Sequence, residues 1–246
     1  MYFSEPQTTP FDLNFSCFGI PVRVSPWFWL GSAVFGFGLV QQDIKLLFIW
    51  GVAVFVSILL HEMGHAVVMR RLGEYPRVVL YFMGGLAIGG GGRRSIDQII
   101  VSAAGPVVQL FLAAFAVAFV RASGHAYPIP IPFWDNAWFD LQGVGLERIP
   151  YPNLSYFLAF LLWINIFWAL INLLPVFPLD GGQIARSVFN MTNPRDGIRQ
   201  SLMLSAVAGG AAAVYGFSVG QPYMGMLFAM LAYDSYQTHQ NTRGWR

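Results

Sequence analysis

The sequence predicts an all-α polytopic membrane protein with about six transmembrane helices and a small β-hairpin or sheet. Of its 246 residues, 56% are hydrophobic, 16% aromatic and only 11% charged, whereas soluble domains carry about 25% charged residues. Several apolar runs approach or exceed the ~18 residues typical of a membrane-spanning helix. No polar segment of domain size interrupts them. We therefore expect one domain over residues 1–246, with a polar N-terminal segment at 1–18 and a polar tail at 234–246.

Charge and cysteine content exclude two classes of protein. The formal net charge is +2 and no basic block occurs, so we expect no nucleic-acid partner. Cys17 is the single cysteine, which rules out an internal disulfide framework and a cysteine-rich zinc site. Residues 1–18 lack the positive start and apolar core of a cleaved signal peptide. Insertion is therefore expected to depend on internal spans.

The first part of the chain combines two apolar spans with β-prone stretches. Alternating Ile20, Val22 and Val24 predict a short strand. Apolar runs then predict spans at 27–40 and 46–71. Residues 77–88 are β-prone on both sides of Gly84 and Gly85, which favours a hairpin. A plain glycine-rich connector is the alternative for that stretch.

The second part of the chain is predominantly helical. Further spans are predicted at 97–120, 154–174, 201–219 and 221–233. Gly105 and Pro106 interrupt the first of these, and small residues there allow close helix approach. Residues 121–152 predict an interfacial loop that includes Trp134 and Trp138. Prolines and glycines between 175 and 182 break the chain near membrane depth, which is permitted where the backbone is buried in protein or lines a cavity.

The 46–71 span carries the motif His61-Glu62-Met63-Gly64-His65. Residues four apart lie on one helix face, so the two histidines can present nitrogens to one metal ion. In this spacing the histidines are zinc ligands and the glutamate is the general base of a metallohydrolase. The surrounding segment is apolar, where ionisable groups are costly and usually functional.

A catalytic zinc usually has three protein ligands, so one more is expected. The carboxylates in or next to apolar spans are Asp97, Asp180 and Asp234. Asp97 follows two arginines and Asp234 opens the polar tail, so both fit solvated interfacial groups. Asp180 lies in a helix break beside Gly181 and Gly182, where the backbone can turn a carboxylate inward. The alternative is that Asp180 caps the helix that begins near Gly181.

Two distant motifs resemble those of the site-2 protease family of intramembrane zinc metalloproteases. They are the HEMGH of residues 61–65 and the NLLPVFPLDGG of residues 172–182. Further similarities are the Ala-Gly-Pro at 104–106, the Gly-Ile-Pro-Val-Arg-Val at 19–24 and the Phe-Met-Gly-Gly at 82–85. The resemblance implies that Asp180 is the third ligand of one Zn²⁺ per chain. It also implies an intramembrane endopeptidase that cleaves membrane-anchored proteins within or near the bilayer, so that residues 1–246 form a transmembrane metalloprotease domain.

The chain departs from the family pattern in two places. Family members often have asparagine a few residues after the Gly-Pro of the third span, whereas this chain has Gln109. Members commonly carry a PDZ or CBS domain, and the chain leaves no room for either. We expect regulation to come from the membrane core or from a separate regulatory protein. The sequence does not specify the oligomeric state.

The remaining site residues are expected to act in proton transfer or substrate binding. Glu62 is expected to accept a proton from the attacking water and to pass it to the leaving amine. Asn172 is a candidate for contacting the substrate or the reaction intermediate, and an interhelical hydrogen bond is its alternative role. The hairpin can pair with an unwound substrate segment, with Gly84 and Gly85 allowing its backbone to approach.

Arginine placement predicts the orientation. In a six-span arrangement most arginines fall on one side of the membrane. The positive-inside rule therefore predicts that both termini and the active site lie towards the cytoplasmic side of the cell membrane. The expected partners are the lipid bilayer and a membrane-spanning protein substrate. The alternative functions are zinc transport across the membrane and a chaperone-like role without proteolysis.

Overall fold

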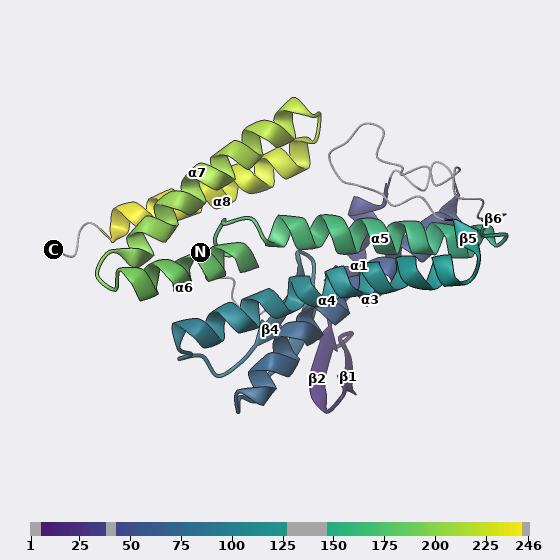
Figure 1. Cartoon of the computed structure of the whole chain (residues 1–246), viewed down its shortest axis with the longest axis horizontal. Helices are drawn as coiled ribbons and strands as arrows, with labels where there is room; N and C mark the ends of the chain where they lie inside the picture. The colour runs from purple at the N-terminus through teal and green to yellow at the C-terminus, as the bar shows by residue number, and fades with distance from the viewer. Residues whose placement is uncertain (1–5, 38–42, 127–146, 243–246) are drawn as a thin grey trace. The chain divides into compact units, whose positions relative to one another are not determined.

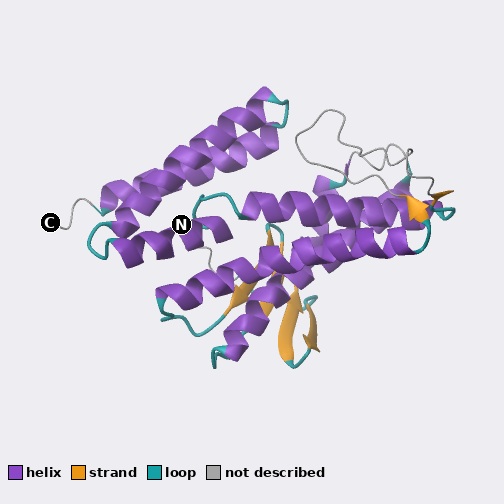
Figure 2. Cartoon of the chain, in the orientation of Figure 1, coloured by secondary structure: helices purple, strands orange, loops and turns teal. Residues whose placement is uncertain are grey.

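The computed structural model describes residues 6–37, 43–126 and 147–242, and within them it is mostly helical (Figures 1 and 2). The helices are α1 (Pro26–Phe35), α3 (Ile44–Arg71), α4 (Ser95–Ala122), α5 (Pro152–Asn172), α6 (Asp180–Thr192), α7 (Gly197–Ser218) and α8 (Pro222–Asn241). All six stretches expected to be spans contain a helix. The predicted all-α class with a small sheet is therefore confirmed. Trp134 and Trp138 of the expected interfacial loop lie outside the described residues.

Four of these helices, α3, α4, α5 and α7, are long and apolar enough to cross a membrane. Each has at least 21 residues, which at 1.5 Å per residue matches the ~30 Å hydrocarbon core. The described part of α1 has 10 residues and therefore rises only about 15 Å. Helix α8 continues past Asp234 into the segment expected to be a polar tail and reaches Asn241.

Helix α4 runs through Pro106 without a break, although the sequence suggested an interruption there. Proline inside a membrane helix is tolerated where neighbouring groups satisfy the freed backbone. The ring of Pro106 is fully buried. The predicted interruption at the Gly105-Pro106 pair is therefore wrong, since both residues lie inside one continuous helix.

A four-stranded sheet has the order β1-β2-β3-β4. The strands are β1 (Leu13–Cys17), β2 (Ile20–Val24), β3 (Arg77–Tyr81) and β4 (Gly84–Ile88). β1 and β2 are antiparallel, β2 and β3 are parallel, and β3 and β4 form an antiparallel hairpin in which Tyr81 pairs with Gly84. The hairpin prediction is thus confirmed over the connector alternative. β1 lies within residues 1–18, for which the sequence predicted only a polar N-terminal segment.

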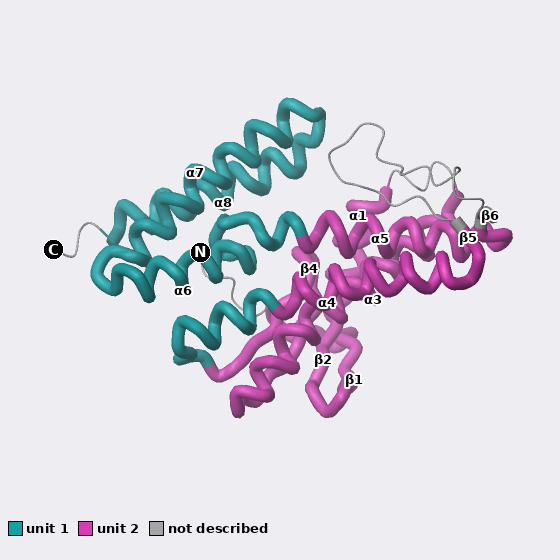
Figure 3. Tube along the Cα trace, viewed as in Figure 1, with its two compact units in different colours: residues 1–3, 91–103, 170–246 teal, residues 4–90, 104–169 magenta. Residues whose placement is uncertain are grey.

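The chain forms two compact units, coloured separately in Figure 3. Unit 2 comprises Ser4–Gly90 and Ala104–Ala169. Its main core joins the sheet to α1 and α3. The buried members are Ile20, Val22, Val24, Phe28, Ile58, Met63, Ala66, Val78 and Leu80. Because Met63 and Ala66 belong to this core, the sheet fixes the part of α3 that carries the histidine motif.

A second cluster in unit 2 packs α4 against α5 through Ala113, Ala116, Leu161 and Leu162. Below it, Asn165 of α5 donates a hydrogen bond of 2.8 Å to the hydroxyl of Ser57 on α3. Both side chains are fully buried. A buried amide satisfied in this way ties two spans together at one register.

Among the described residues, unit 1 comprises Gly91–Ala103 and the chain from Leu170 onwards. Its core packs the segment after α5 against α7 and α8 through Val176, Ala213, Phe228 and Leu231. The backbone N–H of Phe177 donates to the hydroxyl of Ser205 on α7 at 3.1 Å. His239 of α8 is buried with its Nδ1 3.1 Å from the carbonyl oxygen of Arg199. The contact of Phe177 holds the irregular 173–179 segment against α7, and the contact of His239 holds α8 against α7.

Candidate metal centre

The histidine motif lies in the buried part of α3. His61, Glu62 and His65 are 4%, 6% and 6% exposed. The Nε2 atoms of the two histidines are 3.0 Å apart, and their rings meet edge to face. Two imidazole nitrogens at this separation can share one ion, because Zn–N distances are about 2.0–2.1 Å. The i, i+4 expectation from the sequence is therefore confirmed.

Gln109 of α4 contacts the other side of the His61 ring. Its Oε1 lies 2.8 Å from His61 Nδ1, and the Gln109 side chain is fully buried. This contact leaves Nε2 of His61 for a metal ion. No role for Gln109 could be predicted from the sequence, because its contact with His61 depends on the register of α4 against α3.

Two glycines allow α3 and α4 to approach at the motif. A Cβ atom added to Gly64 would lie 2.8 Å from the carbonyl oxygen of Ala104. A Cβ atom added to Gly105 would overlap Nε2 of His65 and lie 2.8 Å from Cε1 of His61. The Ala-Gly-Pro segment of α4 is thus a close-fitting wall for both imidazole rings.

The β3–β4 hairpin covers Glu62. A Cβ atom added to Gly85 would overlap Cγ of Glu62 and lie 2.6 Å from its Oε1. Burial raises the pKa of the Tyr81 hydroxyl, and the negative charge of Glu62 raises it further. Tyr81 and Gly85 therefore place the end of the hairpin at the carboxylate. Gly84 has a φ of +127°. A Cβ atom added to it would lie 3.7 Å from Cζ2 of the Trp168 ring.

Asp180 and Asn172 belong to unit 1. Asn172 is the last residue of α5 and is buried. Asp180 is the first residue of α6, whose N-cap position is Leu179. The capping alternative for Asp180 is therefore wrong, because the residue already lies inside the helix. Gly181 and Gly182 pack directly on the backbone at Leu173 and Val176, which leaves no room for larger side chains.

Within the described ranges, the group of His, Cys, Asp and Glu side chains that could hold a metal ion consists of His61, His65 and Asp180. Two imidazoles and one carboxylate are a donor set that zinc prefers in catalytic sites. The set is consistent with one Zn²⁺, as predicted. Asp97 instead pairs with Arg94 at 2.8 Å, and Asp234 is not part of the set.

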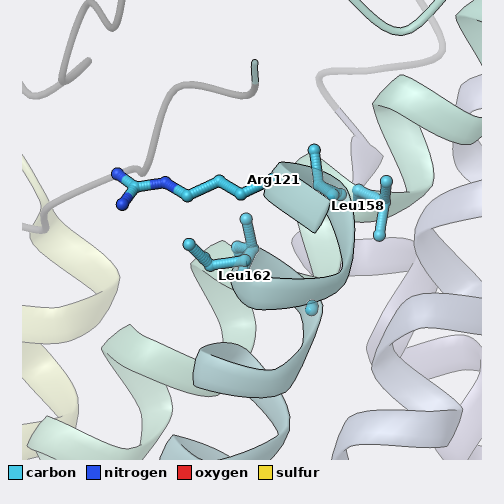
Figure 4. Close-up of a pocket in the computed structure, with 6 residues that line it drawn as sticks. Arg121, Leu158 and Leu162 are labelled. Carbon is cyan, nitrogen blue, oxygen red and sulfur yellow. The ribbon is translucent and has the colours of Figure 1, made fainter. Parts of the chain in front are cut away.

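Figure 4 shows a different place, a hollow between α4 and α5 in which Arg121 extends away from Leu158. It is lined mainly by apolar side chains, including Leu162, and its volume is about 10 Å³. A hollow of this size holds at most one water molecule. It is therefore not a substrate or cofactor site.

Comparison with known proteins decides the family. The model of peptidase family M50 matches residues 147–214. A putative zinc metalloprotease of Synechocystis is 30% identical over 189 residues, which cover 70% of this chain and 42% of the relative. A zinc metalloprotease of Methanocaldococcus jannaschii is 29% identical over 186 residues, covering 72% and 44%. The chain belongs to peptidase family M50.

The fold of this M50 member is also found in a solved structure. The site-2 protease from Methanocaldococcus jannaschii superposes with a TM-score of 0.56 at 22% sequence identity, and 94% of each chain is covered. The resemblance seen in the two motifs is thus confirmed, and the chain is a multi-pass membrane protein. It spans less than half the length of the two relatives named above.

Proposed function

We propose that this M50 member is an intramembrane zinc endopeptidase that cleaves membrane-anchored proteins within or near the bilayer. The observation that carries the proposal is the position of Glu62. Its carboxylate is buried on the same helix turn as His61 and His65 and is packed against the hairpin backbone at Gly85. A buried carboxylate beside a pair of metal ligands is suited to proton transfer.

The residues divide the chemistry between them. Zinc held by His61, His65 and Asp180 would polarise the scissile carbonyl and lower the pKa of a water molecule towards ~7. Glu62 accepts the proton of the attacking water and then delivers it to the leaving amine nitrogen. The hairpin above Glu62 limits solvent access, so the proton passes to the amine rather than to bulk water.

The hairpin also supplies a surface for an extended substrate. β4 is the last strand in the sheet order, and among the described residues it pairs on one side only, with β3. An edge strand binds an extended peptide through main-chain hydrogen bonds with little demand on sequence. Because Gly85 lies against Glu62, a substrate paired along β4 would pass the general base. We therefore assign Gly84 and Gly85 to substrate binding.

Asn172 is assigned to the substrate or to the oxygen that gains charge during attack. Its side chain is buried at the end of α5, where the helix stops before the 173–179 segment. An amide N–H at such a helix break can donate to a carbonyl or an oxyanion. Its partner in this proposal is the substrate.

The proposed orientation places the site and both termini towards the cytoplasmic side of the cell membrane. Arg70 and Arg71 close the last turn of α3, the same end that carries the histidine motif. Clustered arginines next to a span favour the cytoplasmic side. The partners are then the bilayer and a membrane-spanning substrate, with a separate protein as regulator.

The test compares cells that express the wild-type chain with cells that express Glu62→Gln. New protein N-termini are mapped by mass spectrometry, and zinc content is measured on both purified proteins in detergent. Glu74→Gln is the matched control, because Glu74 instead accepts a hydrogen bond of 2.7 Å from the Gly90 backbone outside the motif. The expected result is a set of N-termini in or near membrane segments that the wild type and Glu74→Gln generate and Glu62→Gln does not.

Retention of zinc by Glu62→Gln is part of the expected result, because the base is not a ligand. If Glu62→Gln retains zinc and its cells show the same new protein N-termini as wild-type cells, the protease proposal is overturned. That outcome would leave the transport and chaperone-like alternatives.

A further inference from the structure

We propose that Gln109 is a positioning residue for the metal centre, which it acts on through His61. The inference rests on the proposed function only in that the same zinc site is involved. It concerns how one ligand is oriented, and it can fail while the protease proposal stands.

The geometry that carries the inference is a buried contact between α4 and α3. Gln109 is 0% exposed and His61 is 4% exposed. The distance from Gln109 Oε1 to His61 Nδ1 is 2.8 Å, within the range of a strong N–H···O hydrogen bond. The Gln109 Nε2 atom is also buried and has no hydrogen-bond partner in the described residues.

The direction of this hydrogen bond is linked to metal binding. When Nδ1 of His61 carries the proton and donates to Gln109 Oε1, Nε2 carries the lone pair that can bind a metal ion. If the amide were reversed, its N–H would donate to Nδ1, and the proton of the neutral ring would then sit on Nε2. A protonated Nε2 cannot bind zinc. Only the oxygen-inward orientation of Gln109 is compatible with His61 as a ligand.

The packing around the ring makes this orientation consequential. One turn before Gln109 on the same helix, Gly105 also faces the His61 ring, and even a Cβ atom there would lie 2.8 Å from Cε1. The ring therefore has little room to rotate away from Gln109. Partners that orient a ligating histidine typically contribute 10–100-fold to metal affinity.

The experiment uses the full chain in detergent and three variants of Gln109. Gln109→Met is nearly isosteric and offers Nδ1–H only the weak thioether acceptor. Gln109→Asn keeps the amide on a side chain one methylene shorter. Gln109→Glu keeps an acceptor at the same reach. Three quantities are measured: zinc affinity by competition with a chelator, the visible spectrum of the cobalt(II)-loaded protein, and thermal stability.

Asn165→Leu is the matched control. Asn165 is also a fully buried amide bonded to α3, but its partner is Ser57, one turn before His61. Its removal should lower the melting temperature, because it weakens the contact between α5 and α3. It should leave zinc affinity and the cobalt spectrum as in the wild type.

The expected result is a roughly 10–100-fold loss of zinc affinity in Gln109→Met and Gln109→Asn, with an altered cobalt spectrum. Gln109→Glu should keep the zinc affinity and the cobalt spectrum close to those of the wild type. Wild-type zinc affinity and spectrum in either Gln109→Met or Gln109→Asn would overturn the inference. An equal loss of affinity in Asn165→Leu would also overturn it, since the effect would then come from helix packing. None of these outcomes depends on proteolysis, because zinc affinity, the cobalt spectrum and thermal stability are measured without a substrate.

Discussion

Gly85 lies against Glu62 so closely that a Cβ atom at the glycine would overlap Cγ of the glutamate. Gly85 pairs with Leu80 in the β3–β4 hairpin, and Leu80 is fully buried in the core that also holds Met63. The sheet therefore fixes the position of the hairpin relative to the histidine motif. Strand pairing and the proposed proton transfer depend on the same backbone.

Substitution of Gly85 should remove activity without removing zinc. In Gly85→Ala the new methyl group must displace the Glu62 carboxylate, so kcat/KM should fall by about 10²–10⁴-fold, the usual contribution of a general base. Zinc content should match the wild type, because the ligands are not touched. The control is Gly90→Ala, whose Cβ would lie 3.9 Å from Glu74 Oε2. Full activity in Gly85→Ala would contradict the assignment of this contact.

Substitution of Gly105 should act on the ligands instead. A Cβ at this position overlaps Nε2 of His65 and crowds His61, so Gly105→Ala should lower zinc affinity by roughly 10-fold or more, as loss of ligand orientation does. Chelator competition measures the change. Gly210→Ala is the matched control, because Gly210 is also in a helix and a Cβ there has nothing within 4 Å. Equal zinc affinity in the two variants would show that the packing around Gly105 accommodates a methyl group without displacing the histidines.

The sequence predicted the helices and the metal ligands because both depend on local patterns. Apolar runs of sufficient length specify spans in a bilayer, and the i, i+4 spacing of His61 and His65 fixes their common face. Asp180 could be chosen from three carboxylates because glycines and prolines surround it. These features are readable without knowing which elements are neighbours.

The roles of Gln109 and β1 could not be read in the same way. Gln109 lies on a helix that is apolar on most sides, and its contact with His61 depends on how α4 is rotated against α3. In the strand Leu13–Cys17, Leu13, Phe15 and Cys17 alternate with polar residues as in a strand, but the stretch is short and its residues are mostly exposed. Its pairing with Ile20–Val24 stabilises it instead.

Removal of the carboxylate ligand should abolish zinc retention. Asp180→Ala leaves two imidazoles, which are too few for a catalytic zinc site, so purified protein should contain little zinc after dialysis against a mild chelator. Asp97→Ala is the control, since Asp97 pairs with Arg94. Elemental analysis of the purified proteins measures the difference. Wild-type zinc content in Asp180→Ala would exclude Asp180 as a ligand.

Asn172 should affect turnover more than folding. If its amide donates to the substrate, Asn172→Leu should lower kcat/KM by about 10²-fold, a typical loss for such a donor, with zinc content and melting temperature close to the wild type. Asn165→Leu provides the comparison, because Asn165 bonds to Ser57 and should lower stability. A lower melting temperature with unchanged kcat/KM in Asn172→Leu would assign Asn172 to helix packing.

The proposed orientation can be tested by labelling single cysteines, since Cys17 is the only native one. In a Cys17→Ser background, Tyr75→Cys places a thiol just after α3, where the native side chain is 98% exposed. Lys45→Cys places one at the opposite end of the same helix. A membrane-impermeant maleimide added to intact cells should label Lys45→Cys, whereas Tyr75→Cys should react only in inside-out vesicles, because the arginine-rich end of α3 is expected in the cytoplasm. The reverse labelling pattern would place the metal centre towards the outer side of the membrane.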